Sequence, residues 1–499
     1  MTKWAVYCDG MGIRRMALTT IFPGFEGTRS APAWLHAAID GGLGGVLLFG
    51  RNIDPSRADE GVAELITDLR RNAPHLLVAV DEEGGDVTRL DAANGSAFPG
   101  SAALGAVGDT DLTRAVAAEL GLRLRRCGID VDLAPVADVD ANEHNPVIGV
   151  RSFGTDPKHV ADHVAAFIDG LQSYGVAATA KHFPGHGATS EDSHVSTPVV
   201  DAPLDVLESR EFVPFQAAID ADVKVIMTAH LRALAIDPDH PATVSPDVIT
   251  GVLRHRLGYD GVVMTDGLDM HAISRTLGQA EGAVQALAAG VDALCVGGDS
   301  VDAGAVDEIA DAIVAAVESG RLSADRLADA AGRVQALQAW TRGPLPDDRP
   351  KTTPSAAMTA ATHALATGGD VNLDGPTLVI ELQSRPSLAA GQVPWGVGQA
   401  LRERVPDTVV VERTRESAGD LAVVDAHPDR RVVVVVRGTR RHPWQVEAVR
   451  RIRAARPDLV VVDHGVPSAP EVLGDRYVLA RDASRATTVA AVQALTAVT

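Results

Sequence analysis

Residues 180–194, AKHFPGHGATSEDSH, combine one lysine, three histidines and two acidic side chains within a single short run. Imidazole titrates near neutral pH, and a neighbouring carboxylate orients it and favours its protonated form. His194, two residues after Asp192, therefore predicts a general acid/base pair. The alternative is an exposed loop histidine beside a chance aspartate. Lys181 and His182 could supply hydrogen bonds to a polar substrate.

The same run has glycines that would allow a loop to move. Gly185 and Gly187 are expected to let the loop close over a substrate and open again, although Pro184 limits the freedom of its base. His186 lies between the two glycines, and we expect it to hold the loop rather than to react.

A second chemical signal is the carboxylate of Asp266, which closes the apolar run GVVMT from Gly261. A carboxylate that ends a buried strand is expected at the rim of a sheet rather than in the core. Asp266 is therefore a candidate reactive group, and a cap on the following helix is the structural alternative. Asp269, three residues on, is expected to be the cap or a surface residue.

These side chains need elements to hold them, and before residue 300 short apolar runs alternate with longer amphipathic stretches. Such alternation is typical of a parallel sheet covered by helices. The candidate strands are LTTIFPG from Leu18, GVLLFG from Gly45, LLVAVDE from Leu76, DVDLAPVAD from Asp130, AATAKHF from Ala177, VKVIMTAH from Val223, GVVMTDG from Gly261 and ALCVGG from Ala293. Eight strand–helix units predict an α/β fold, a (β/α)8 TIM barrel, with a doubly wound open sheet as the alternative.

In a TIM barrel the C-terminal strand ends meet at one mouth. The third strand runs into DEEGGDVTRL, the fourth loop carries NPVIGVRSFG, the fifth leads into the histidine-rich run, and the seventh ends at Asp266. Each charge alone would more often be a surface residue. Four such segments at a single mouth indicate a functional site.

These four segments resemble family 3 glycoside hydrolases, in the β-N-acetylglucosaminidase branch. The matching motifs are Asp-x-Glu-Gly-Gly, Asn-Pro-Val-Ile-Gly-x-Arg-Ser-Phe-Gly, Lys-His-Phe-Pro-Gly-His-Gly followed by Asp-Ser-His, and Thr-Asp-x-Leu-x-Met. The resemblance extends over most of residues 20–340. A small departure is Asp86, where an arginine is common.

The resemblance implies a retaining exo-β-N-acetylglucosaminidase that needs no cofactor or metal and acts on a carbohydrate, with peptidoglycan fragments as the natural source. It implies Asp266 as the nucleophile and His194 as the acid/base oriented by Asp192. Sugar contacts are implied for Asp81, Arg89, Arg151, Lys181 and His182. Cleavage with retention needs a carboxylate that forms the glycosyl–enzyme bond and a separate proton donor, and these residue types meet both needs.

Three other functions stay open at this point. His182, His186, Asp192 and His194 are acceptable zinc ligands for a TIM-barrel hydrolase, although no HxH or HExxH arrangement supports that function. A neutral histidine base repels phosphate less than a carboxylate does, so a β-N-acetylglucosaminide phosphorylase is a second possibility. A non-catalytic sugar-binding protein is the third, and it would be expected to lack the nucleophile or the proton donor.

Composition limits the partners. A formal net charge of −21 argues against a nucleic-acid partner or an anionic membrane, because phosphate binding requires a basic face. The sequence has three widely spaced cysteines, Cys8, Cys127 and Cys295, and no CxxC pair. This cysteine usage suits a reducing compartment. The N-terminal residues lack the apolar core of a signal peptide, and no run of eighteen apolar residues predicts membrane insertion. We therefore expect a cytoplasmic protein, while the oligomeric state stays open.

Two domains are expected. A catalytic barrel is predicted over residues 1–343, a proline-rich linker and connecting helix over 344–374, and a smaller α/β sandwich over 375–499. Strand-like runs in the last part are TLVIEL, TVVVER, LAVVDA, RRVVVVVRG, DLVVVDHG and RYVLARD, with a helix over PWQVEAVRRIRAARP. This domain carries no nucleotide fingerprint or nucleophile elbow, so we expect it to be a scaffold or an interface.

Overall fold

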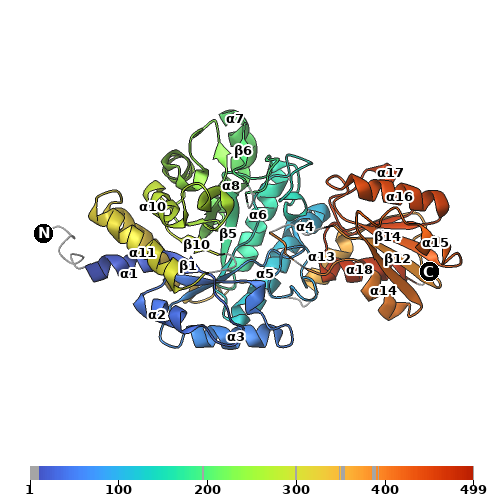
Figure 1. The fold of residues 1–499 in the computed structure, drawn as a ribbon, viewed down its shortest axis with the longest axis horizontal. Helices are drawn as coiled ribbons and strands as arrows, with labels where there is room; N and C mark the ends of the chain where they lie inside the picture. The colour runs from blue at the N-terminus through green and yellow to red at the C-terminus, as the bar shows by residue number, and fades with distance from the viewer. Residues whose placement is uncertain are drawn as a thin grey trace.

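The computed structural model describes residues 10–193, 196–297, 301–347, 349, 355–384, 389–391 and 393–497. Two bodies of α/β structure follow one another along the chain, and the helix α13 (Ala356–Ala364) lies between them (Figure 1). The N-terminal body is a barrel of parallel strands, and the C-terminal body is a six-stranded open sheet. The prediction of a TIM barrel followed by a smaller α/β sandwich is confirmed.

The barrel strands pair in parallel in the order β2, β3, β4, β5, β7 and β9, and a bridge between Met264 and Ala293 joins β9 to β10. β10 pairs with β1, and Phe22 of β1 packs against Gly45 of β2 to complete the ring. The strands are β1 (Ile21–Pro23), β2 (Gly45–Leu48), β3 (Leu77–Val80), β4 (Val131–Asp132), β5 (Ala177–Phe183), β7 (Val225–Thr228), β9 (Val262–Thr265) and β10 (Leu294–Val296). The predicted strands lie at these positions, and the ring excludes the open-sheet alternative.

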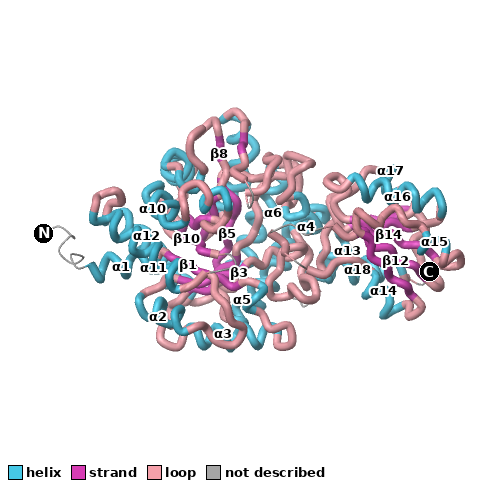
Figure 2. The backbone as a smooth tube through the Cα atoms, viewed as in Figure 1, coloured by secondary structure: helices cyan, strands magenta, loops and turns pink. Residues whose placement is uncertain are grey.

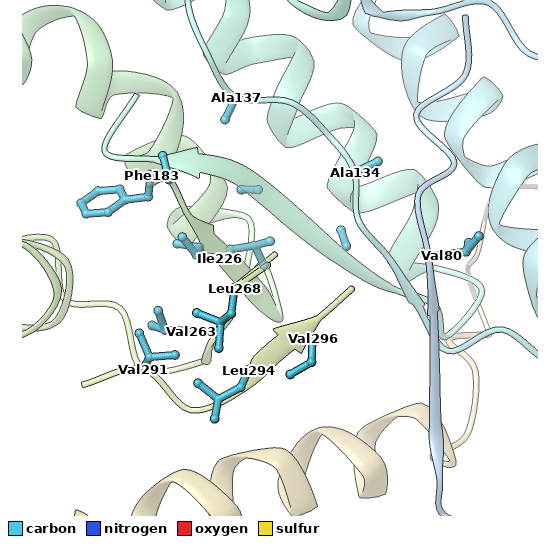
Figure 3. Packing of buried hydrophobic residues seen from close by; sticks show 14 of the residues in the cluster. Val80, Ala134, Ala137, Phe183, Ile226, Val263, Leu268, Val291, Leu294 and Val296 are labelled. Carbon is cyan, nitrogen blue, oxygen red and sulfur yellow. The ribbon is translucent and has the colours of Figure 1, made fainter. Parts of the chain in front are cut away.

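Apolar side chains on the barrel strands alternate between the inside of the barrel and the layer under the helices. On β7, Val225 and Met227 belong to the cluster inside the barrel, and Ile226 between them belongs to the cluster under the helices. β9 and β10 follow the same rule, because successive side chains of a strand point to opposite faces. Figure 3 shows the outward-facing Ile226, Val263 and Leu294 on three neighbouring strands. Both faces of the sheet are therefore buried, as in a TIM barrel.

Helices surround this ring (Figure 2). They are α1 (Gly10–Thr19), α2 (Ala33–Gly41), α3 (Ala58–Leu69), α4 (Ser101–Val107), α5 (Thr110–Cys127), α6 (Pro157–Gln172), α7 (Leu204–Val206), α8 (Phe212–Asp220), α9 (His271–Ser274), α10 (Gln279–Ala289), α11 (Ala303–Glu318) and α12 (Ala324–Thr341), with a π-helix over Asp247–Arg256. A short parallel pair, β6 (Val199–Val200) and β8 (Arg232–Ala233), lies outside the ring. None of the helices in the described ranges is long and apolar enough to cross a lipid bilayer.

The C-terminal sheet has the order β11, β16, β15, β14, β12, β13, and only β11 runs antiparallel to its neighbour. Its strands are β11 (Ala366–Gly368), β12 (Thr377–Leu382), β13 (Thr408–Arg413), β14 (Arg431–Val436), β15 (Val460–Asp463) and β16 (Tyr477–Leu479). Its helices are α14 (Gly398–Arg404), α15 (Ala422–Asp425), α16 (Pro443–Ala455), α17 (Pro470–Leu473) and α18 (Arg485–Leu495). Val449 of α16 packs on one face of the sheet and Val492 of α18 on the other.

One predicted strand is wrong. LAVVDA forms the short helix α15 instead, with Val424 packed into the core. A short apolar run fits a buried strand or one turn of buried helix equally well, and packing decides between them. The helix α13 contacts α4 and α5 of the barrel and α18 of the C-terminal domain. The exact domain boundaries at residues 343 and 375 stay predictions.

Candidate active site

The C-terminal strand ends surround a pocket of about 470 Å³. Residues from the β3, β4, β5, β7, β9 and β10 ends line it, together with a segment of the C-terminal domain. Six of the predicted site residues lie in its wall, namely Asp81, Arg89, Arg151, Lys181, His182 and Asp266. The fold thus brings together side chains that are up to 185 positions apart, from Asp81 to Asp266.

Charged side chains form a continuous network along one wall of the pocket. The Lys181 ammonium donates to Asp81 Oδ1 and lies equally close to Glu83 Oε1, at 2.6 Å in both cases. The Arg151 guanidinium forks onto Glu83 with N–O distances of 2.7 and 2.9 Å. Arg89 Nη2 donates to Asp81 Oδ2 at 3.1 Å. Every carboxylate in the network therefore has at least two cationic partners.

These contacts fix the protonation states. Burial alone would raise the pKa of Asp81, but the charges of Lys181 and Arg89 outweigh it and hold that pKa well below its usual range. Burial opposes ionisation of Glu83 in the same way, yet Arg151 and Lys181 lower its pKa to about 2. For Lys181, burial disfavours the charge while Asp81 and Glu83 favour it, and its pKa is raised. Asp81, Glu83 and Lys181 are therefore charged at neutral pH.

An extra residue in β5 brings both Lys181 and His182 to the pocket. Simple alternation would turn one of them toward the helices, but the β5–β7 register shifts between Ala180 and Phe183. Ala180 and Phe183 both face the outer core, and the two polar residues between them line the pocket. Asp138, which the sequence reasoning missed, accepts from His182 Nδ1 at 2.7 Å.

In the loop that follows β5, His186 makes hydrogen bonds to two other loop residues. His186 Nδ1 lies 2.8 Å from Thr189 Oγ1, and His186 Nε2 lies 3.3 Å from Ser193 Oγ. Burial lowers the pKa of His186 to about 4, so it is a neutral link within the loop. A Cβ on Gly187 would lie 1.7 Å from Val139 O, so this glycine is needed for close packing.

The predicted acid/base pair can be placed only in part. Asp192 is half-buried on the loop next to Ser193, which lines the pocket. The backbone oxygen of Asp192 accepts from Ser196 N at 3.1 Å. His194 lies outside the described residues. The placement of its imidazole therefore stays a prediction from the sequence.

Asp266 lies directly after β9, where its carboxylate lines the pocket. Its Oδ1 accepts from Gly267 N at 2.8 Å, and its own backbone N donates to Thr228 O of the neighbouring strand end. The next helix, α9, has Met270 at its N-cap position, which excludes the capping alternative for Asp266. Asp269 was expected to be a cap or a surface residue, but it also lines the pocket.

Glu82 supports the turn that carries Asp81 and Arg89. Its Oε2 accepts from Arg89 N at 2.9 Å and from Leu90 N at 3.0 Å. Burial raises the pKa of this carboxyl to about 7. Its unfolded pKa is about 4.3, so folding disfavours its ionised form. The stability that Glu82 contributes is complete below about pH 4 and is lost as pH rises toward 7.

Glutamine cannot ionise, so Glu82→Gln is expected to remove the loss of folding stability that Glu82 causes as pH rises. The free energy of unfolding of the variant, relative to wild type, should rise by roughly 3 kcal/mol between pH 4 and pH 8. Urea unfolding across this range measures the difference, and Glu60→Gln, at an exposed glutamate of α3, is the control. A difference that stays constant with pH would contradict the assignment.

Two further features were not predicted from the sequence. Asn145 Nδ2 donates to the backbone oxygens of His186, Gly187 and Thr189 and so ties two loops together. Residues 389–391 of the C-terminal domain reach the pocket wall. Asp138 ends the predicted fourth strand and Asn145 begins the loop segment after it, so their polar types are visible in the sequence, whereas the small residues 389–391 carry no signal. His230 is a satisfied core histidine, with Thr243 Oγ1 and Gly267 O as partners.

The chain is similar in sequence to a known protein family and to several named enzymes. The family model described as "Glycosyl hydrolase family 3 N terminal domain" matches residues 27–337. A β-hexosaminidase of Stenotrophomonas maltophilia is 40% identical over 282 residues, covering 55% of this chain and 81% of that protein. β-Hexosaminidase A of Pseudoalteromonas piscicida is 32% identical over 318 residues, covering 59% of this chain. The match spans about half of that relative's length, 53%.

A solved structure matches both domains. The family 3 β-N-acetylglucosaminidase from Paenibacillus sp. str. FPU-7 superposes with a TM-score of 0.86 at 33% sequence identity. The superposition covers 97% of this chain and 96% of that one. The shared fold therefore includes the C-terminal sheet as well as the barrel.

Proposed function

Because the chain belongs to glycosyl hydrolase family 3, we propose that it is a retaining exo-β-N-acetylglucosaminidase acting on peptidoglycan fragments. The glycone follows from the activity by which the relatives are named. The observation that carries the proposal is the position of Asp266, whose carboxylate opens onto the same pocket as the five predicted sugar-contact residues. A carboxylate among sugar-binding groups at a barrel mouth is what glycosyl transfer requires.

The proposed reaction has two displacements. In the first, the Asp266 carboxylate attacks the anomeric carbon while His194, oriented by Asp192, protonates the departing glycosidic oxygen. This step releases the aglycone and leaves a glycosyl ester on Asp266. In the second, His194 takes a proton from water as the water oxygen attacks the same carbon and the carboxylate leaves. Two inversions at one carbon give net retention.

The remaining polar residues hold the sugar in this proposal. Each Asp81 oxygen already accepts one charged donor, and a carboxylate oxygen has a further lone pair for a sugar hydroxyl. Lys181, Arg89, Arg151 and His182 supply donors from around the same wall. Because Asp81 and Glu83 neutralise most of this positive charge, the wall presents directed hydrogen bonds rather than a strong net field.

We also place the protein in the cytoplasm. Cys127 and Cys295 are buried free thiols, and burial raises the pKa of both, so neither is poised for disulfide exchange. Such cysteines suit a reducing compartment.

One experiment on the wild-type protein tests glycone, acceptor and stereochemistry together. Aryl β-N-acetylglucosaminide and aryl β-glucoside are compared with and without phosphate, and NMR identifies the first sugar product. We expect β-N-acetylglucosamine to appear first from the N-acetylglucosaminide in both buffers, and activity to survive exhaustive chelation. Sugar 1-phosphate as the main product would instead establish a phosphorylase, and binding without turnover would establish a sugar-binding protein.

A further inference from the structure

The turn that follows β3 carries Asp81, Glu83 and Arg89 and is fastened to the C-terminal domain through a residue that does not line the pocket. Asp86 lies in the middle of this turn and is almost completely buried. Its Oδ2 pairs with the Arg437 guanidinium, and its Oδ1 accepts from Ala483 N at 2.9 Å. Both partners belong to the C-terminal domain, so one carboxylate of the barrel holds two separate segments of the other body.

Gly85, the residue before Asp86, makes a second contact that links the turn to the C-terminal domain. Gly85 packs so closely on Gly100 that a Cβ would lie 2.7 Å from the Gly100 Cα atom. Gly100 N in turn donates to Asp482 Oδ2 at 2.6 Å, in the segment next to Ala483. Gly85 and Asp86, in the middle of the turn, are thus both packed against the segment of the C-terminal domain around Asp482.

The C-terminal domain also touches the pocket end of the turn. Arg89 Nη2 donates to Ala389 O at 3.0 Å, and Arg89 Nη1 donates to Ala390 O at 3.4 Å. Nη2 of the same guanidinium donates to Asp81 Oδ2. The direction in which Arg89 points therefore depends on where the C-terminal domain sits.

We propose that Asp86 is a positioning residue through which docking of the C-terminal domain sets the geometry of the sugar-binding turn. The C-terminal domain then acts on sugar binding as well as on the fold, which goes beyond the scaffold or interface role expected from its sequence. Asp86 does not line the pocket, so it would act through Asp81 and Arg89, which do. This inference rests on the proposed function, since it assigns the turn to sugar binding.

The orientation of the Arg437 side chain is also fixed by its neighbours. Its guanidinium lies over the Trp395 ring, 5.4 Å from the ring centroid, so it is oriented before it meets Asp86. In Asp86→Asn the amide oxygen can still accept from Ala483 N, but the amide nitrogen then faces the guanidinium as a second donor. The substitution therefore disturbs one contact while it preserves the size of the side chain.

The test measures steady-state kinetics on the aryl N-acetylglucosaminide with the full-length chain. We expect Asp86→Asn to raise KM by about ten- to a hundredfold and to leave kcat within about threefold of wild type, because a misplaced turn weakens sugar contacts. Arg437→Ala should raise KM similarly, and Arg437→Lys should recover part of the loss, because an ammonium still reaches one Asp86 oxygen. The Asp86→Asn and Arg437→Ala effects should not add in the double variant.

Glu119→Ala is the matched control for domain docking in general. Glu119 of α5 accepts from Ala357 N of α13 at 3.3 Å, away from the turn. It should leave KM unchanged. The proposal is overturned if wild type turns over substrate and Asp86→Asn has the same KM, or if Glu119→Ala raises KM equally. If wild type shows no turnover, the proposed function itself fails. If Asp86→Asn does not fold, the KM values of Arg437→Ala and Arg437→Lys test the same contact.

Discussion

Asp266→Asn is expected to lower kcat by at least about a thousandfold while binding of N-acetylglucosamine stays close to wild type. Asparagine has the shape of aspartate and can still accept the 2.8 Å hydrogen bond from Gly267 N. It cannot form the glycosyl ester, because the neutral amide is a poor nucleophile. Kinetics on the aryl substrate and calorimetric titration with N-acetylglucosamine separate the two effects.

The neighbouring carboxylate provides the control for this prediction. Asp269 lines the same pocket three residues later, so Asp269→Asn removes a negative charge from nearly the same place. We expect a much smaller loss of kcat from it. Azide should restore turnover in Asp266→Ala by filling the space of the carboxylate and should give the α-glycosyl azide. A larger loss in Asp269→Asn than in Asp266→Asn would reverse the assignment.

Lys181→Met is expected to be the most destabilising change in the pocket, at about 3–5 kcal/mol near neutral pH. The ammonium is almost fully buried and lies 2.6 Å from both Asp81 and Glu83. Methionine fills the space but leaves two neighbouring carboxylates with less positive charge. Sugar binding should also weaken, because Lys181 itself lines the pocket.

The destabilisation caused by Lys181→Met should depend on pH, because Glu83 must be ionised to pair with Lys181. Glu83 has a folded-state pKa of about 2, below its unfolded value of about 4.3, so its ion pairs stabilise the fold above that unfolded value. That stability is lost as pH falls toward 2. The difference between wild type and Lys181→Met should therefore be largest at pH 7 and shrink in acid. Urea unfolding at several pH values between 3 and 7 measures it.

An exposed lysine provides the comparison. Lys158 of α6 pairs with Asp162 one helical turn later, and both side chains are largely solvent-exposed. Lys158→Met should leave the free energy of unfolding unchanged within error, because water screens such pairs. If Lys181→Met is as mild as Lys158→Met, or if its effect does not change with pH, the buried network does not have the ionisation state described above.

The sequence was sufficient to predict the barrel because its strands are nearly continuous apolar runs, buried on both faces. It also predicted which segments meet, because the C-terminal ends of parallel barrel strands converge. It could not show that β5 gains an extra residue between Ala180 and Phe183, since a bulge depends on the neighbouring strand. The helix α15 was missed for a related reason, because LAVVDA has no period long enough to identify.

The contacts between the domains were beyond sequence reasoning for a different reason. Ala389 and Ala390 take part through their backbone oxygens, and any residue has those. Asp86 finds its partner Arg437 351 positions later, and neither residue stands in a pattern that points to the other. The protonation states likewise depend on burial and on partners far along the chain, as the contrast between the neighbours Glu82 and Glu83 shows.

If Asp266 is the nucleophile, it becomes covalently bonded to the sugar during turnover, and this glycosyl–enzyme intermediate can be trapped. A 5-fluoro-N-acetylglucosaminyl fluoride slows both displacements through its ring fluorine, while its good leaving group keeps the first faster than the second. Peptide mass spectrometry of the inactivated protein should find one fluorosugar, attached to Asp266. Attachment to Asp269, Asp81 or another residue, or turnover with no adduct under these conditions, would contradict the assignment of Asp266 as the nucleophile.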